Sequence, residues 1–204
     1  MDEEEVNHFA LPNWNQTEIA HFRTTSAISK RMTAKMEFVN ALRAEVAKEF
    51  LNELPDTDEQ IHILSNGEFD YWGVIARGIA LCKCKINLLF IASWSLILPI
   101  AHSIVDHIKS GKVQSCVVWL NSFFKRKDPS TWGFLVNNLH ELGQKIFSTK
   151  THCKIAAWEC EDGRFFVYSG SANLTANPRM EQNFIANSKP LYDFYVETYK
   201  KLEK

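Results

Sequence analysis

From residue 61 to the end of the chain, short apolar runs alternate with longer segments that have helical periodicity. Turn residues bound the short runs, whereas the longer segments repeat apolar side chains every three or four positions. The expected strands are residues 61–64, 86–92, 113–120, 145–147, 152–159, 164–168 and 183–186, and the expected helices are 71–81, 96–109, 132–142 and 190–202. This alternation predicts an α/β fold, in which helices flank both faces of a mixed sheet.

The first 58 residues have a different pattern and predict an N-terminal helical arm or cap on an α/β domain at 59–204. Apolar residues recur at helical spacing among charged ones, at Met36, Val39, Leu42, Val46, Phe50 and Leu54. Pro55 and Asp56 end this run. With 204 residues and 46% hydrophobic content, the chain can bury the core of one sizeable domain. Packing of the arm on that domain is favoured over a dedicated partner-binding helix.

Charge and cysteine content narrow the class of protein. The formal net charge is −1, and because four of the first five residues are acidic, the remainder carries +3. That value neither demands nor excludes a nucleic-acid partner. Five cysteines form an odd set, and no leader opens the chain, which predicts a cytoplasmic protein. The most apolar stretch, 86–101, is shorter than the roughly 20 residues of a membrane span. We therefore expect no membrane partner.

Two of the cysteines, Cys82 and Cys84, have the spacing of half a metal site. No second pair at zinc-ligand spacing follows, and the seven histidines are scattered. Buried free thiols without a metal are therefore the expectation for the cysteines.

A candidate site begins at His152 and Lys154, which are two residues apart on an expected strand and so share one face of the sheet. The pair Asp162 and Gly163 is a strong signal for a hairpin turn. A two-residue or a four-residue loop would place this face opposite Ser171 and Asn173, whereas a three-residue loop would break the parity.

Together these four residues would surround a tetrahedral phosphate with hydrogen-bond donors: an imidazole, an ammonium, a hydroxyl and a carboxamide. Gly170, directly before Ser171, would let the backbone approach such a group closely. A basic run, Lys125, Arg126 and Lys127, follows Phe123 and Phe124, and either grips a phosphate backbone or forms a solvated loop. Trp94, Trp119 and Trp158 lie in apolar strand contexts and are expected in the core.

Residues 151–183, THCKIAAWECEDGRFFVYSGSANLTANPRMEQN, resemble the signature of the phospholipase D superfamily, H-x-K followed by G-S-x-N and a downstream acid. The resemblance implies that His152 attacks phosphorus, with a second such histidine protonating the leaving oxygen. It implies that Lys154 and Asn173 hold the non-bridging oxygens, that Ser171 supports the phosphate, and that Glu181 orients a histidine. No metal or other cofactor is implied.

The chain departs from the family pattern in two ways. It holds only one such motif, so the resemblance implies a homodimer that brings two His152 residues to a shared axis. The position five residues after the lysine, often aspartate in the family, holds Glu159, for which Asp162 is a possible substitute. The expected function is a metal-independent phosphodiesterase, a nuclease acting on DNA or RNA. Phospholipid hydrolysis or transfer, and an inactive nucleic-acid-binding protein, remain as alternatives.

Overall fold

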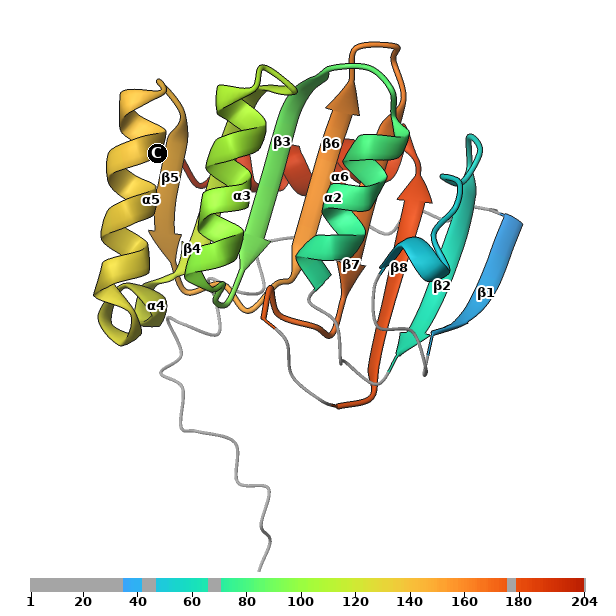
Figure 1. Cartoon of the computed structure of the whole chain (residues 1–204), viewed down its shortest axis with the longest axis horizontal. Coiled ribbons are helices and arrows are strands. Elements are labelled where there is room, and N and C mark those ends of the chain that lie inside the picture. Colours follow the sequence, from blue (N-terminus) through green and yellow to red (C-terminus); the bar gives the residue numbers. More distant parts are fainter. Residues whose placement is uncertain (1–34, 42–46, 66–70, 176–178, 204) are drawn as a thin grey trace, which may run out of the picture. The chain divides into compact units, whose positions relative to one another are not determined.

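A mixed sheet forms the centre of the described structure, a computed structural model that describes residues 35–41, 47–65, 71–175 and 179–203. All of these residues belong to one unit, Ala34–Lys204. Among them, eight strands pair in the order β1-β2-β8-β7-β6-β3-β4-β5 (Figure 1). The strands are β1 (Lys35–Ala41), β2 (Glu59–Ser65), β3 (Ile86–Ser93), β4 (Val113–Asn121), β5 (Lys145–Thr149), β6 (Ile155–Cys160), β7 (Phe165–Gly170) and β8 (Glu181–Asn187).

Strand directions in this sheet follow from the lengths of the connections. The central strands β3, β6, β7, β8 and β2 pair antiparallel, whereas β3, β4 and β5 on one side and β1 with β2 on the other pair parallel. Helices connect β3 to β4 and β4 to β5, as parallel pairing requires. The helical elements are η1 (Ala47–Glu49), α2 (Tyr71–Leu81), α3 (Leu98–Lys109), α4 (Ser122–Lys127), α5 (Pro129–Glu141) and α6 (Lys189–Lys200).

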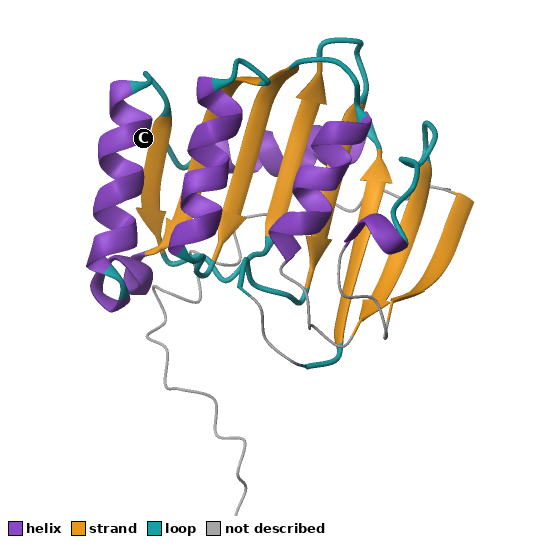
Figure 2. Cartoon of the chain, in the orientation of Figure 1, coloured by secondary structure: helices purple, strands orange, loops and turns teal. Residues whose placement is uncertain are grey.

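Helices lie on both faces of the sheet, as expected: α2, α3 and α5 on one face and α6 on the other (Figure 2). The side chains of β6 alternate between two apolar cores, which explains why both faces are covered. Ala156 and Trp158 belong to the core that α2, α3 and α5 cover, whereas Ile155 and Ala157 pack in a second core with the buried residues of α6. A strand that is apolar on both faces must be covered twice.

Residues 86–101 form β3 and the beginning of α3. None of the helices within the described ranges has the length and apolar character that crossing a membrane requires.

Two expectations from the sequence are wrong. Residues 35–41 were expected in a helix through Met36 and Val39, but they form β1, which pairs with β2 from Lys35 opposite Glu59 onward. The backbone bonds of this ladder outweigh the local periodicity. Of the rest of the expected arm, residues 1–34 and 42–46 lie outside the described residues. Residues 47–58 are described, and they form the short helix η1 (Ala47–Glu49) followed by turns and irregular backbone, so the helix expected through Phe50 and Leu54 is wrong there too.

The basic stretch expected as a turn or loop is also a helix, α4. The side chain of Asn121 accepts a hydrogen bond from the Phe123 amide at 2.8 Å and so caps its beginning. Asp128 ends α4 and caps α5, accepting from the Thr131 amide at 3.0 Å.

Candidate functional site

The residues singled out by the motif lie at one edge of the sheet. His152 and Lys154 directly precede β6, Gly170 ends β7, and Glu181 begins β8. Because β6, β7 and β8 are antiparallel neighbours, the beginning of β6 and of β8 and the end of β7 meet at the same edge (Figure 1). Ser171 follows β7 directly and so belongs to this edge.

His152 and Lys154 form a hydrogen-bonded pair. The Lys154 Nζ donates to His152 Nδ1 and to the His152 carbonyl oxygen, each at 2.9 Å. An ammonium has no acceptor, so Nδ1 must accept, and the proton of the neutral ring then lies on Nε2. The His152 side chain is exposed, and its ring reaches an open pocket of about 460 Å³.

Lys154 is 9% exposed, and burial lowers the pKa of its ammonium. Nearby Cys153 and Glu181 oppose this effect, because negative charge on either would favour the charged amine. Lys154 is therefore a largely desolvated cation beside His152, where its attraction for an anion is stronger than in water.

Ser171 is held between two residues of β8. Its Oγ donates to Glu181 Oε2 in a short hydrogen bond and accepts from the Gln182 amide at 3.1 Å. Glu181 thus fixes the hydroxyl of Ser171, and among the described residues it makes no hydrogen bond to His152. In this chain Glu181 orients the serine, whereas the resemblance implies that it orients a histidine.

The hairpin between β6 and β7 has a three-residue loop, so the parity expected from a two-residue or four-residue loop is wrong. The Cys160 amide donates to the Arg164 carbonyl at 2.9 Å, and Glu161, Asp162 and Gly163 form the loop. Gly163 has a φ of 86°, a left-handed conformation that completes a turn of this length.

This register places Lys154 opposite Gly170, whose amide donates to the Lys154 carbonyl at 3.3 Å. The motif residues still meet, because His152 and Lys154 precede the regular strand and do not follow its alternation. Gly170 is required by its neighbours in β8: a Cβ there would collide with the Asn183 side chain and lie 2.5 Å from the Gln182 carbonyl oxygen. The close approach that Gly170 allows is therefore between β7 and β8.

Asn173 lies in the loop after β7, beside Leu174, which bridges to Leu96 beyond β3. The Asn173 Oδ1 is buried and accepts no hydrogen bond from the described part of the chain. A buried amide oxygen without a donor costs about 1–3 kcal/mol, so the bonding of this residue is incomplete in the single chain.

The segment before Lys154 is held in place by hydrogen bonds to β4 and α6. The Asn121 side chain donates to the Thr151 carbonyl, and the Thr151 hydroxyl bonds the Tyr199 hydroxyl of α6 at 2.8 Å. Thr151 also accepts from the Cys153 amide at 3.2 Å. These bonds connect the ends of β4 and α6 to the backbone that carries His152.

An aromatic group beside His152 was missed by sequence reasoning, which assigned Trp94 to the core. Trp119 and Trp158 are buried, but Trp94 is only partly buried and its ring lies 4.9 Å from the His152 ring. Phe123, 43% exposed, stacks on Trp94 at 5.9 Å. The position of Trp94 in the sequence could have indicated this, because Trp94 directly follows β3 and so lies at the edge of the sheet where the motif was expected.

The basic run continues this aromatic group. The Arg126 guanidinium lies 5.7 Å from the centre of the Phe123 ring, and the Lys125 ammonium lies 5.7 Å from that of Trp132. Lys125, Arg126 and Lys127 are all exposed in the last turn of α4. The aromatic rings and the basic side chains therefore form one continuous surface from His152 to α4.

Neither carboxylate proposed for the missing aspartate reaches the site. Glu159 lies near the end of β6, where Tyr192 donates to it at 3.3 Å. Asp162 lies in the hairpin loop and pairs with Arg164 at 2.7 Å, which lowers its pKa. The site is therefore built without an equivalent of that aspartate in the described residues.

No protein-family model matches the sequence, and no curated protein is detectably similar to it. Solved structures do match in three dimensions. The phospholipase D family member Nuc from Salmonella typhimurium shares 15% identity at a TM-score of 0.46, over 60% of this chain and 82% of that one. A polyphosphate kinase from Porphyromonas gingivalis shares 11% identity at a TM-score of 0.55, over 71% of this chain but only 26% of the kinase. A phosphatidylserine synthase from Haemophilus influenzae shares 12% identity at a TM-score of 0.44, over 70% of this chain and 37% of the synthase. Identities this low bear on the fold alone.

Proposed function

We propose that this chain, which has a phospholipase D-like α/β fold, is a metal-independent phosphodiesterase that cleaves nucleic-acid phosphodiester bonds. One observation carries the proposal: the exposed imidazole of His152 is hydrogen-bonded to the desolvated ammonium of Lys154 at the edge of an open pocket. A nucleophile beside a buried cation is what attack on an anionic phosphodiester needs.

The proposed reaction has two steps. A His152 nitrogen attacks phosphorus, forming a P–N bond while the P–O bond to the leaving group breaks, and a second His152 gives its proton to the departing oxygen. Water then attacks phosphorus, the P–N bond breaks, and the water proton passes to the second imidazole. Lys154 and Asn173 hold the non-bridging oxygens, and Ser171 supports them.

Each chain supplies one His152, so the reaction requires two chains, and we propose a homodimer with the site at its interface. The proton donor must be an imidazolium that becomes a neutral imidazole when it gives up its proton, whereas the attacking ring must be neutral with one nitrogen free. A neutral ring that accepts from Lys154 at Nδ1 has its proton on Nε2 and has no free nitrogen. A phosphate that draws Lys154 away would leave Nδ1 of that ring able to attack.

The aromatic and basic surface favours nucleic acid over phospholipid as substrate. Trp94 and Phe123 offer ring faces on which a base would stack, and Lys125, Arg126 and Lys127 would follow the phosphates beyond it. Stacking of this kind contributes about 1–3 kcal/mol per base. A phospholipid headgroup has no aromatic base to stack on these faces.

The decisive experiment compares wild type with His152→Ala on a labelled oligonucleotide and on phosphatidylcholine, with and without EDTA. We expect wild type to cleave the oligonucleotide, EDTA to leave cleavage unchanged, and the variant to lose at least about a thousandfold in rate, as removal of a covalent nucleophile does. Oligonucleotide binding by both proteins without cleavage by either would instead show a binding protein. Turnover of phosphatidylcholine alone would show a phospholipid enzyme.

A further inference from the structure

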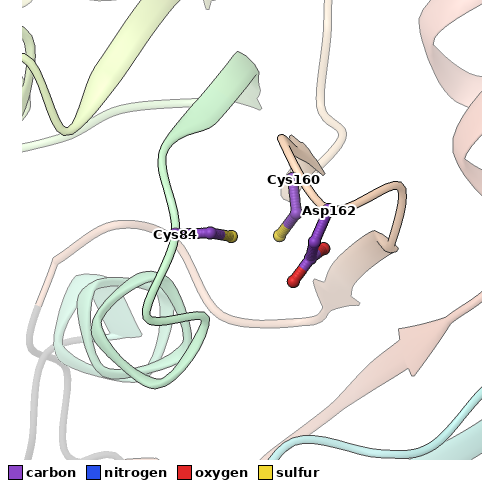
Figure 3. A group of neighbouring side chains, drawn as sticks. All are labelled: Cys84, Cys160 and Asp162. Atoms are coloured by element: carbon purple, nitrogen blue, oxygen red, sulfur yellow. The ribbon is translucent and has the colours of Figure 1, made fainter.

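A group of thiols lies at the opposite edge of the sheet from His152. Cys84 follows α2, Cys160 ends β6, and Asp162 lies in the next turn, with the three side chains directed toward one another (Figure 3). β6 is six residues long, so the two edges are about 17 Å apart, at about 3.3 Å per residue of strand. This group is separate from the proposed phosphodiesterase site.

The ligand atoms are close enough to share one ion. A sulfur of Cys84, a sulfur of Cys160 and a carboxylate oxygen of Asp162 all lie within 4.8 Å of one another. Cys82 adds a third thiol, with its Sγ 3.3 Å from that of Cys160. A tetrahedral zinc ion, with Zn–S bonds of about 2.3 Å, holds its sulfurs about 3.8 Å apart. The Cys82 thiol now donates to the Gly78 carbonyl at 3.3 Å and accepts from the Trp158 indole at 3.4 Å, so its side chain would have to rotate away from both to become the fourth ligand.

Two short segments supply these groups, each with ligands two residues apart: Cys82 with Cys84, and Cys160 with Asp162. The backbone already holds the segments together, because the Glu161 amide donates to the Lys85 carbonyl at 2.9 Å. Lys83, between the first two thiols, has a φ of 54°, a turn conformation that costs free energy for a residue with a side chain. The second pair has no zinc-ligand signature in the sequence, because it consists of one cysteine and one aspartate.

Positive charge around the group matches the charge of a filled site. Three thiolates and one carboxylate around Zn²⁺ would leave a net charge of −2. Arg164 donates to Asp162 Oδ2 at 2.7 Å and to the Cys82 carbonyl at 3.0 Å, and the Lys112 ammonium bonds the Cys84 carbonyl at 2.5 Å. Cations in these places offset the ligand charge, and Arg164 would also orient the carboxylate.

We propose that Cys82, Cys84, Cys160 and Asp162 bind one zinc ion that fastens the β6–β7 hairpin to the end of α2. A site with four protein ligands has no open position, so its role is structural. It is compatible with metal-independent chemistry at His152 and does not depend on it. The competing outcome is a disulfide between Cys82 and Cys160, formed by two-electron oxidation of their thiols with transfer of two protons and two electrons to a disulfide reagent.

The test uses the full chain, loaded with excess zinc in a reducing buffer and then desalted. Wild type should retain stoichiometric zinc, and cobalt in its place should give the visible absorption of tetrahedral coordination with a thiolate-to-metal charge-transfer band. Cys84→Ala and Asp162→Asn, both at residues that are not buried, should lose the retained zinc and the zinc-dependent rise in Tm.

Cys116→Ala is the matched control, because Cys116 is a buried thiol of β4 outside the group, and it should retain zinc like wild type. Equal retention by Cys84→Ala and wild type, or no retention by wild type, would overturn the proposal. So would a Cys82–Cys160 disulfide in the freshly purified protein that persists in place of metal binding. Because EDTA-resistant cleavage at His152 is measured separately, failure of the zinc site and failure of the nuclease proposal are distinguishable.

Discussion

Lys154 must carry its charge to hold a phosphate, yet burial lowers the pKa of its ammonium while Glu181 raises it. Removing the negative charge in Glu181→Gln should therefore lower the pKa of Lys154 further. Activity should be lost on the alkaline side at a lower pH than in wild type, because Lys154 then deprotonates earlier. The pH profile of kcat/KM measures this shift.

Ser171→Ala separates charge from hydrogen bonding in this test. It removes the bond between Ser171 and Glu181 but leaves the carboxylate charge, so the rate should fall while the alkaline limb stays in place. An alkaline limb that is the same in Glu181→Gln as in wild type would show that Lys154 does not set it.

Gly170 tests whether the site depends on the close contact of β7 with β8. In Gly170→Ala the new methyl would meet the Asn183 side chain and the Gln182 carbonyl, and overpacking of this kind costs about 1–3 kcal/mol. The matched control is Gly133→Ala in α5, where nothing lies within 4 Å and alanine should stabilise the helix by about 0.5–1 kcal/mol. Urea unfolding of both variants measures the two effects, and equal midpoints would contradict the role given to Gly170.

The residues that the sequence singled out by type and order lie together in the structure, whereas a residue that matters by its position was missed. His152, Lys154, Ser171, Gly170 and Glu181 are recognisable by type and order, and the structure brings them to one edge. Trp94 was missed because a tryptophan after an apolar strand has the same local pattern whether it packs in the core or beside a site.

Among the elements, α4 and the end of β3 test the choice of nucleic acid as substrate. Phe123→Ala removes an exposed ring stacked on Trp94, and loss of one base stack of about 1–3 kcal/mol would weaken oligonucleotide binding roughly 5- to 150-fold. Phe194→Ala, at a ring of similar exposure on α6, is the control and should bind like wild type. Fluorescence anisotropy with a single-stranded oligonucleotide measures both, and equal affinities would exclude stacking on Phe123.

Elements with a clear apolar pattern of their own were predicted well, whereas β1, which depends on a distant partner, was not. The helix at 71–81 agrees with α2 residue by residue, because its periodicity and boundaries are local. β1 was missed because its pairing with β2 crosses about twenty residues of chain and leaves no periodic trace at Lys35–Ala41. The hairpin loop was misjudged because Asp162-Gly163 fits a two-residue turn and, with Glu161, a three-residue turn equally well.

For the whole molecule, the proposed chemistry and the single motif together predict a dependence on chain concentration. Both steps need two imidazoles, so a site shared by two chains forms only when they associate. Specific activity should fall on dilution below the dimer dissociation constant, and analytical ultracentrifugation should find dimer and monomer over the same range.

A mixing experiment makes the same point without dilution. When a fixed amount of wild type is mixed with a growing excess of the His152→Ala chain, more of the wild-type chains enter mixed dimers that hold only one His152. Each mixed dimer lacks either the nucleophile or the proton donor, so the rate should fall toward zero as the excess grows, whereas the same excess of an unrelated protein should leave it unchanged. A rate that stays constant in the mixture, from a protein that sediments as a monomer, would mean that one His152 suffices and that the two-chain mechanism is wrong.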